Sequence, residues 1–349
     1  MGSEIGFAII GCGTIADVHA AAIKDISDAQ LVIVYSRNPE NAKKLGSKYQ
    51  VDWTSSWDEL KNNSDIDIVS ICTPSGTHLD YGSLAAESGR HVIVEKPIEV
   101  TTERGQLLIE ICRRKGIKLA VIYQNRFLPD VQLLKDRIQS QQLGDVFLAD
   151  AYIKWYRSQE YYDRANWRGT MTLDGGGVLI NQAIHTIDLL QWIVGKVESV
   201  SAYTGTYTHK NIEGEDTAVA VLKFKNGAIG VIEASTSVKP AMERRIEIHG
   251  EKGSAILKGE ELIFWDDGTS ESKIDLKADK SDATGSSAPM QNFSLLAHKN
   301  QFLAILDAIR NDQEPPVSGT ESLHSLATVA AIYESAKTGI PAVLRYYKL

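Results

Sequence analysis

The sequence predicts a two-domain protein in which a doubly wound α/β domain precedes an α+β domain. Up to residue 124, short β-branched runs that are apolar throughout alternate with helical patterns, as in a parallel sheet covered on both faces. Beyond that point, longer segments alternate apolar and polar residues and are joined by turn signals, which is typical of antiparallel strands. A length of 349 residues also favours two domains, which we place at residues 1–124 and 125–349.

The elements of the first domain follow one another in strict alternation. We expect strands at residues 5–10, 31–34, 66–72, 91–94 and 117–122. Helical patterns lie between them at residues 16–23, 39–49, 78–88 and 102–114. Gly89 and Gly116 follow two of these helices at positions that suit a helix C-cap. Strands and helices in this order form a parallel sheet with right-handed crossovers.

The second domain is predicted to contain an antiparallel sheet with helices on one face. Expected strands lie at residues 146–156, 197–208, 216–224, 228–238, 245–249 and 255–257, and Asn226-Gly227 marks a hairpin turn. The expected helices lie at residues 128–139, 179–194, 295–310 and 320–337. Residues 273–292 are polar and rich in turn formers, so we expect a surface loop there.

Composition excludes several classes of protein. The net charge of −8 and the pI near 5.6 argue against a broad nucleic-acid-binding face. No apolar run approaches the roughly 20 residues of a membrane helix, so no membrane partner is expected. Residues 1–4 lack the features of a signal peptide, and Cys12, Cys72 and Cys112 form no CxxC pair. We expect a cytoplasmic protein with reduced thiols and no metal site.

The turn after the first strand carries a dinucleotide fingerprint. Gly11 permits a tight turn, Gly13 lets a pyrophosphate approach the backbone, and Ala16 stands where the third glycine of the motif usually lies. Thr14 and Ile15 open the following helix, whose amino end favours anions. This turn therefore predicts a site for a nicotinamide cofactor.

The end of the second strand bears on the choice of cofactor. NAD-selective sites carry an acidic residue here, whereas this chain has Ser36 and Arg37. A hydroxyl and a guanidinium suit the 2′-phosphate of NADP, but Arg37 as a solvated loop residue is a serious alternative. The residues leave NAD and NADP both open.

Two further loops follow strands of the same sheet. Pro74 forces an extended path in the loop that starts at Thr73 and ends at His78, where the chain leaves the third strand. The tripeptide Glu95-Lys96-Pro97 places an ammonium at the carboxyl end of the strand at residues 91–94. Ligands bind at that edge of an open parallel sheet, so redox chemistry is expected there.

Together these motifs resemble the Gfo/Idh/MocA oxidoreductase family. The GCGxIA turn, the TPxxxH loop, the EKP tripeptide and a later GGG…H…D block occur here in the family's order, and the resemblance covers nearly the whole chain. It implies a Rossmann domain, an open-faced C-terminal sheet, and hydride transfer between a nicotinamide and a sugar or cyclitol carbon. It also implies a homodimer or homotetramer. The implied cofactor contacts are Gly11, Gly13, Thr14, Ile15, Ser36, Arg37, Thr73, Pro74, His78, Glu95, Lys96 and Gln124.

Lys96 matches the catalytic lysine of the family, and an ammonium there would stabilise a developing alkoxide. Its expected partner is His185, which can accept the hydroxyl proton. In a helix from residue 179, Asn181, His185 and Asp188 share one face. Asn181 departs from the aspartate that many members carry, and an amide can orient a group but takes no proton. Lys96, His185 and Asn181 are therefore the candidate catalytic residues.

The substrate site is expected where aromatic residues and arginines concentrate. Aromatic faces pack on sugar rings, and arginine pairs with carboxylate or phosphate groups. The candidate substrate contacts are Lys96, Arg126, Tyr156, Arg157, Tyr162, Trp167, Arg168, Asn181 and His185. The roles of Trp167 and Arg168, in substrate or cofactor binding, stay open.

Residues 154–188 resemble the WlbA-type branch of the family, the UDP-N-acetylglucosaminuronic acid 3-dehydrogenases. That resemblance implies a sugar-nucleotide uronate oxidised at C3, and NAD as the cofactor, against the argument from Ser36 and Arg37. An inositol or free-sugar dehydrogenase is the alternative within the same class. A non-catalytic NAD(P)-binding sensor and an NAD-assisted glycosidase are alternatives of other classes.

Overall fold

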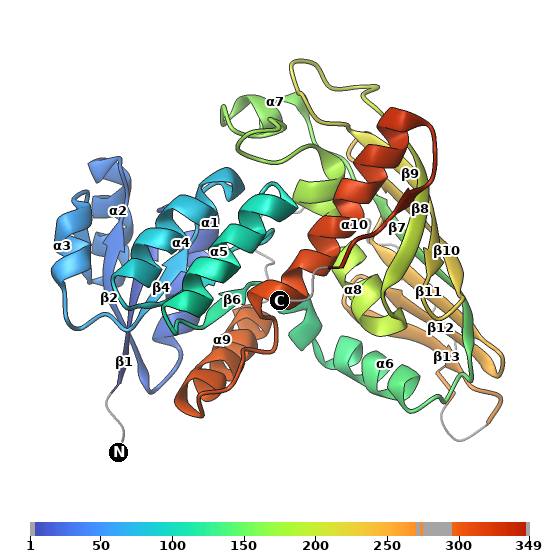
Figure 1. The fold of residues 1–349 in the computed structure, drawn as a ribbon, viewed down its shortest axis with the longest axis horizontal. Helices are drawn as coiled ribbons and strands as arrows, with labels where there is room; N and C mark the ends of the chain where they lie inside the picture. Colours follow the sequence, from blue (N-terminus) through green and yellow to red (C-terminus); the bar gives the residue numbers. More distant parts are fainter. Residues whose placement is uncertain (1–3, 270–272, 275–294, 347–349) are drawn as a thin grey trace. The chain divides into compact units, whose positions relative to one another are not determined.

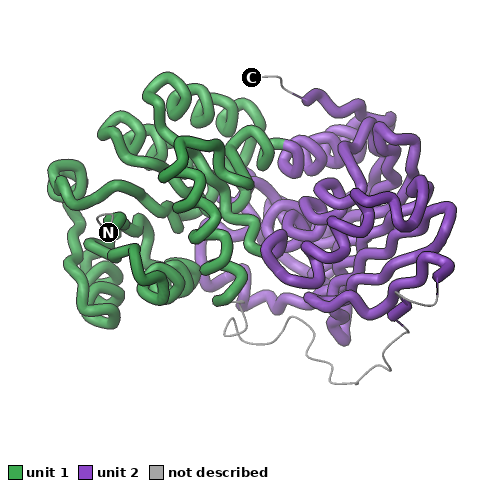
Figure 2. The backbone as a smooth tube through the Cα atoms, turned by 90° about the horizontal axis from the view of Figure 1, so that it is seen from below, with its two compact units in different colours: residues 1–124, 292–323 green, residues 125–291, 324–349 purple. Residues whose placement is uncertain are grey.

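The computed structural model describes residues 4–269, 273–274 and 295–346, and the chain divides into two compact units (Figure 2). The first unit comprises Met1–Gln124 and Asn292–Leu323, and the second comprises Asn125–Gln291 and His324–Leu349. The division after residue 124 coincides with the expected domain boundary. The membership of residues 292–323 differs from the expectation, which placed them in the second domain.

The first unit contains a parallel sheet with strand order β3-β2-β1-β4-β5-β6 (Figure 1). Its strands are β1 (Ile5–Ile10), β2 (Ala29–Tyr35), β3 (Asp52–Thr54), β4 (Ile68–Ile71), β5 (His91–Val94) and β6 (Leu119–Val121). The strand order reverses direction between β1 and β4, which is the switch point where open α/β sheets bind ligands. The predicted doubly wound fold is therefore confirmed.

The helices of this sheet are α1 (Thr14–Lys24), α2 (Pro39–Tyr49), α3 (Trp57–Asn62), α4 (His78–Glu87) and α5 (Thr102–Arg114). The sequence did not predict β3 or α3, because elements of three and six residues are too short to show a periodic pattern. The core strand β1 is solvent-excluded from Phe7 to Ile10, in agreement with its wholly apolar sequence.

Helix α9 (Leu295–Arg310) belongs to the first unit although it is far away in sequence. It buries Phe302, Ile305 and Leu306 in the core that contains β1 and α1, and the ring of Phe302 meets that of Phe7 edge to face. Burial of this apolar face outweighs proximity along the chain. The expected boundary was therefore wrong for this segment.

The second unit contains a mixed sheet with strand order β13-β12-β11-β7-β10-β9-β8-β14. Its strands are β7 (Val146–Lys154), β8 (Val197–Gly205), β9 (Thr217–Phe224), β10 (Ile229–Ser235), β11 (Arg245–Gly250), β12 (Gly253–Lys258), β13 (Glu261–Asp266) and β14 (Ala342–Val343). Strands β7 and β10 pair in parallel, and the other neighbours pair antiparallel. The predicted, mainly antiparallel sheet is confirmed.

The helices of the second unit are α6 (Pro129–Gln139), α7 (Gln159–Asp163), α8 (Ile184–Val194) and most of α10 (Gly319–Thr338). Helix α8 contacts β7, and residues of β9 alternate between a buried face and an exposed face. Apart from Lys273 and Ile274, the expected loop at residues 273–292 lies outside the described residues. No helix in the described part of the chain combines the length and the apolar character needed to span a membrane.

Candidate active site

The glycine turn after β1 is shaped for a dinucleotide. Gly11 has a φ of +92°, and a Cβ there would lie 2.7 Å from the carbonyl oxygen of Cys72, so only glycine fits. Gly13 is the N-cap of α1, no side chain caps this end, and a Cβ on Gly13 would meet open space. Thr14 and Ile15 begin the helix, two residues before the expected start at Ala16. The residues present therefore fit a bound pyrophosphate at the switch point.

The end of β2 presents no carboxylate to a ribose. The Ser36 hydroxyl accepts a hydrogen bond from the backbone amide of Asn38 at 3.2 Å. The Asn38 side chain in turn caps α2 by accepting from the Glu40 amide at 3.0 Å. Arg37 is exposed. Ser36 thus has a structural task at this turn, and the Arg37 side chain is accessible to solvent.

His78 has a different role from the predicted cofactor contact. Its ring is fully buried, and its two nitrogens lie 3.0 Å from the Pro97 carbonyl oxygen and 3.1 Å from that of Thr73. Because the ring lies between these two carbonyls, it links the loop at Thr73-Pro74 to the segment that follows Lys96. His78 therefore holds these two loops in place from the protein interior. We no longer count it among the residues expected to contact the cofactor directly.

The buried carboxylate of Glu95 is hydrogen-bonded to the backbone of Lys96. Glu95 is buried, and its Oε2 accepts a hydrogen bond from the backbone amide of Lys96 at 3.2 Å. Its Oε1 lies 2.9 Å from Nε2 of His19, which is fully buried on α1. The expected contact between Glu95 and a cofactor is therefore replaced by a contact that fixes the backbone of Lys96.

The pKa shifts of this pair favour the charged form of both groups. Burial alone would raise the pKa of Glu95, but the hydrogen bond and the charge of His19 lower it to about 2. Burial alone would lower the pKa of His19, but Cys72 and Glu95 raise it to about 10. Nδ1 of His19 lies 2.8 Å from the Ser70 hydroxyl. The sequence analysis missed His19, although a histidine on the apolar face of α1 was a visible signal.

Gln124 lies directly after β6, at the end of the first unit. Its side chain is buried, and its Oε1 has no hydrogen-bond partner among the described residues. A buried amide oxygen without a partner is costly unless a ligand or water satisfies it. This observation agrees with the predicted cofactor contact of Gln124.

The helical segment that carries His185 begins against Glu215, a residue that the sequence analysis missed. A Cβ on Gly177 would lie 1.8 Å from the Glu215 carbonyl oxygen, so the glycine run permits this close contact within the unit. The Glu215 carboxylate accepts hydrogen bonds from the amides of Gly177 at 3.2 Å and Leu179 at 2.8 Å. Burial raises the pKa of Glu215 to about 7 despite these hydrogen bonds.

Asn181 and His185 are distinguished by their exposure. A π-helical turn, η3 (Leu179–Ala183), precedes α8, and from Val178 to Gln191 every residue is buried except these two, which are partly exposed. Asn181 Nδ2 donates to the Asp174 carboxylate at 2.6 Å, and Asn181 Oδ1 accepts from Gln182 Nε2 at 2.6 Å. The amide of Asn181 is therefore held in one orientation.

Asp188 does not share this accessible face, contrary to the expectation. It is buried and receives two hydrogen bonds from the guanidinium of Arg126 at 2.6 and 2.7 Å, and one from the Ser325 hydroxyl at 2.7 Å. The surroundings of Asp188 are therefore decided by its buried ion pair with Arg126 and not by its spacing along the helix. Because the Arg126 guanidinium is buried in this ion pair, we remove Arg126 from the predicted substrate contacts.

The predicted substrate segment forms a cluster around Tyr161. The guanidinium carbons of Arg157 and Arg168 lie 5.2 and 4.2 Å from the centre of its ring. Arg157 Nη2 donates to Gln182 Oε1 at 2.8 Å, and Gln182 Nε2 donates to the Tyr161 hydroxyl at 3.0 Å. Two cations and an aromatic face thus lie next to the helix that carries Asn181 and His185.

Three other residues were predicted to contact the substrate, and each has different surroundings in the structure. Trp167 is half-buried with the Arg168 guanidinium 5.5 Å from its ring, and Tyr156 is half-buried beneath the ammonium of Lys239 at 4.1 Å. Tyr162 is buried, with its hydroxyl 3.0 Å from that of Thr236. Tyr162 is therefore part of the core, which argues against the predicted direct contact with substrate. Tyr161 is the better candidate, which the sequence analysis did not select.

Two family models match the chain and define its class. Residues 5–123 match the model described as "Oxidoreductase family, NAD-binding Rossmann fold", and residues 135–344 match "Oxidoreductase family, C-terminal alpha/beta domain". The protein is thus an NAD-dependent oxidoreductase of the sugar dehydrogenase type. It belongs to the Gfo/Idh/MocA family, as its motifs indicated.

Solved structures and curated relatives give finer similarities. The WlbA dehydrogenase from Bordetella pertussis, in complex with NADH and UDP-GlcNAcA, is 34% identical with a TM-score of 0.86, covering 98% of this chain and 99% of that chain. The WlbA dehydrogenase from Chromobacterium violaceum, with the same ligands, is 33% identical with a TM-score of 0.88, covering 100% and 98%. The inositol 2-dehydrogenase of Rhizobium meliloti is 26% identical over 95% of this chain and 96% of its own length.

Proposed function

We propose that this protein oxidises a sugar-nucleotide uronate, such as UDP-N-acetylglucosaminuronic acid, at C3 with NAD as the hydride acceptor. The observation that carries the proposal is the cluster of Arg157, Arg168 and Tyr161, which contacts Asn181 and Gln182 of the segment leading to His185. A guanidinium recognises a carboxylate, and an aromatic face packs on a sugar ring. The similarity to two WlbA dehydrogenases at 33–34% identity supports the same substrate class.

The proposed mechanism divides the reaction among three side chains. When bound, NAD supplies the acceptor for the hydride that leaves the carbinol carbon. The ammonium of Lys96 stabilises the developing alkoxide, and His185 accepts the hydroxyl proton, so the alcohol loses a hydride and a proton and becomes a ketone. Asn181, held by Asp174, orients the hydroxyl or the imidazole and takes no proton.

The test is incubation of the purified protein with UDP-N-acetylglucosaminuronic acid and NAD, followed by mass spectrometry for the 3-keto product. 2-Oxoglutarate should be added in parallel, because a tightly held cofactor needs an acceptor for recycling. UDP-N-acetylglucosamine, which has a hydroxymethyl group in place of the sugar carboxylate, serves as the control substrate. Absence of a 3-keto product with and without 2-oxoglutarate would reject this substrate class.

An inositol or free-sugar dehydrogenase is the second candidate. It is favoured by the match to an inositol 2-dehydrogenase over 95% of this chain. The same hydride and proton transfers apply, but the cluster of arginines then lacks an anionic group to bind. Turnover of myo-inositol or unmodified sugars that exceeds turnover of the sugar nucleotide would support this alternative.

Replacement of His185 by asparagine is expected to lower turnover by about 10²–10⁴-fold, since general acid–base catalysis contributes that much. Asparagine keeps a polar group at the partly exposed position but cannot accept the proton. Steady-state rates at saturating substrate measure the effect, and NADH binding should stay unchanged. The matched control is His249→Asn on β11, where the imidazole contacts Ser254 and the activity should not change. A His185 variant as active as the control would contradict the proposed role.

We further propose that NAD is preferred to NADP. The solved WlbA structures contain NADH, and Ser36 is engaged in its own turn. The expected result is a higher kcat/KM for NAD, measured with both cofactors at the same substrate concentration. If Arg37 instead binds a 2′-phosphate, wild type prefers NADP and Arg37→Ala loses that preference, which would reverse our assignment.

A homo-oligomer formed through the exposed face of the sheet is also proposed. Tyr203, Val219, Val221 and Ile229 lie on this face according to the strand register, and Tyr203 is 83% exposed. An apolar patch on a flat sheet suits contact with the same face of a second copy. Val221→Lys is expected to convert the assembly to monomers in light scattering after size exclusion, whereas Lys44→Glu on α2 should not. A wild-type protein that is monomeric at micromolar concentration would contradict the proposal.

A cytoplasmic location is proposed on two grounds. Cys12, Cys72 and Cys112 are free thiols in the structure, as expected in a reducing compartment. The proposed reaction also consumes NAD and a sugar nucleotide. Fractionation of the native host with detection of this chain tests the location.

A further inference from the structure

The connection between β8 and β9 is organised around the buried carboxylate of Asp216. Its oxygens accept hydrogen bonds from the backbone amides of Tyr207, Thr208 and His209 at 2.8–3.1 Å. Burial alone would raise the pKa of Asp216, but these amides and the His209 ring hold it well below its usual range. Asp216 is therefore an ionised anchor that fixes three consecutive residues of this connection.

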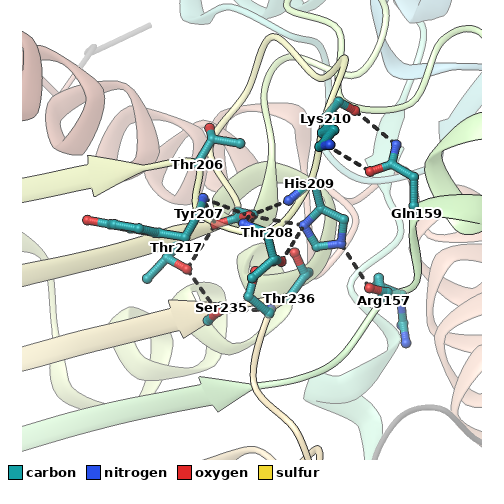
Figure 3. A network of polar contacts seen from close by, with 12 residues as sticks. Arg157, Gln159, Thr206, Tyr207, Thr208, His209, Lys210, Thr217, Ser235 and Thr236 are labelled. Carbon is teal, nitrogen blue, oxygen red and sulfur yellow. Dashed lines mark hydrogen bonds and ion pairs between the residues drawn. The ribbon is translucent and has the colours of Figure 1, made fainter.

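The imidazole of His209 connects Asp216 to a second segment of the unit, the one that contains Arg157. Its Nδ1 lies 3.1 Å from Oδ2 of Asp216, and its Nε2 lies 2.8 Å from the carbonyl oxygen of Arg157 (Figure 3). Through its two nitrogens the ring therefore links the Asp216 carboxylate to the backbone carbonyl group of Arg157.

The same connection holds the segment after Arg157 at further points. The Gln159 side chain pairs with the backbone of Lys210, accepting at 2.8 Å and donating at 2.9 Å (Figure 3). The Arg157 amide donates to the Thr236 carbonyl at 2.8 Å. The Tyr162 ring meets the His209 ring edge-on, with 4.7 Å between the ring centres. The backbone of Arg157 is thus fixed at both its amide and its carbonyl group.

We propose that His209 and Asp216 are positioning residues that set the direction of the Arg157 guanidinium and thereby the selectivity for an acidic sugar. The inference rests on the proposed function, in which Arg157 binds the carboxylate of the substrate. A long arginine side chain binds a carboxylate well only if its backbone is held, because otherwise ordering costs free energy on binding. Neither residue is among the proposed catalytic groups, so the effect is expected on substrate selection rather than on the chemical step.

The test compares wild type with His209→Phe, which keeps an aromatic ring next to Tyr162 but removes both ring nitrogens and their hydrogen bonds. The expected result is a rise of about tenfold in KM for UDP-N-acetylglucosaminuronic acid, with kcat at saturation within about twofold of wild type. The ratio of kcat/KM between this substrate and UDP-N-acetylglucosamine should shrink by a similar factor. His209→Gln, which retains an amide donor, should recover part of the selectivity. The matched control is His249→Phe on the β11–β12 hairpin, which should leave the ratio unchanged.

Two results would overturn the proposal. One is a His209→Phe enzyme that loses activity toward acidic and neutral sugars equally, which indicates a merely structural role. The other is an unchanged KM and an unchanged ratio. If His209→Phe does not fold, His209→Gln is measured in its place with the same criteria.

Failure of the proposed function has a different signature. In that case the wild-type protein turns over neither sugar nucleotide. The positioning of the Arg157 backbone is then tested directly by hydrogen exchange of the peptide at residues 156–163. Exchange is expected to be faster in His209→Phe than in His249→Phe, and equal exchange would reject the positioning role.

Discussion

Replacing Lys96 with methionine is expected to lower turnover by about 10²–10³-fold, the usual cost of removing one group that stabilises a developing oxyanion. Methionine has a similar length and apolar stem, so the substitution removes the ammonium with little change in volume. The backbone of Lys96 should stay in place, because Glu95 and His78 hold this loop through main-chain groups and their own side chains. The expected measurement is a loss in kcat with an unchanged dissociation constant for NADH.

The control for this experiment is Lys44→Met, the same substitution at an exposed position of α2. It should retain the wild-type rate. A Lys96→Met enzyme with near-normal turnover would remove the lysine from the mechanism. A loss of NADH binding in proportion to the loss of rate would instead assign Lys96 to cofactor binding.

The substitution Glu95→Gln is expected to lower the free energy of unfolding by about 3–5 kcal/mol at neutral pH, because breaking a buried ion pair leaves one charge without its partner. The charge left behind is that of His19, which is fully buried. Chemical denaturation monitored by fluorescence measures the change. Glu243→Gln, which breaks an exposed pair with Lys258, is the matched control and should change stability by less than about 1 kcal/mol.

The effect of Glu95→Gln should depend on pH in a defined direction. The pKa of Glu95 is lowered from 4.5 to about 2 in the folded state, so its stabilisation is present above pH 4.5 and is lost as the pH falls toward 2. The pKa of His19 is raised from 6.5 to about 10, so its stabilisation is present below pH 6.5 and is lost as the pH rises toward 10. The difference between wild type and variant should therefore be largest between pH 4.5 and 6.5. A difference that is constant from pH 4 to 10 would contradict the ion pair.

How much of the site the sequence predicted depends on how local each signal was. Gly11, Gly13 and the turn into α1 were predictable, because a tight turn and a helix start are decided by neighbouring residues. Lys96 and His185 were also selected by their motifs, and their catalytic roles stay predictions. Tyr162 and Arg126 were chosen for their residue types alone, and their burial against Thr236 and Asp188 depends on segments far away in sequence.

Residues missed by the sequence analysis share one property, which is that their partners are distant along the chain. His19 meets Glu95 across 76 positions, and His209 meets the carbonyl of Arg157 across 52. A single buried histidine has no periodic pattern that distinguishes a core residue from one that positions a loop. Only the folded chain shows which carboxylate or carbonyl it contacts.

By itself the sequence determined the two sheets and the motif residues, because the spacing of apolar residues and the glycine turns act over a few positions. The tertiary structure alone decided that α9 completes the core of the first unit and that Arg126 forms a buried ion pair with Asp188. It also decided that Glu95 and His209 each hold a neighbouring loop. These outcomes follow from burial and from the satisfaction of buried charges, which depend on distances in space that no local pattern encodes.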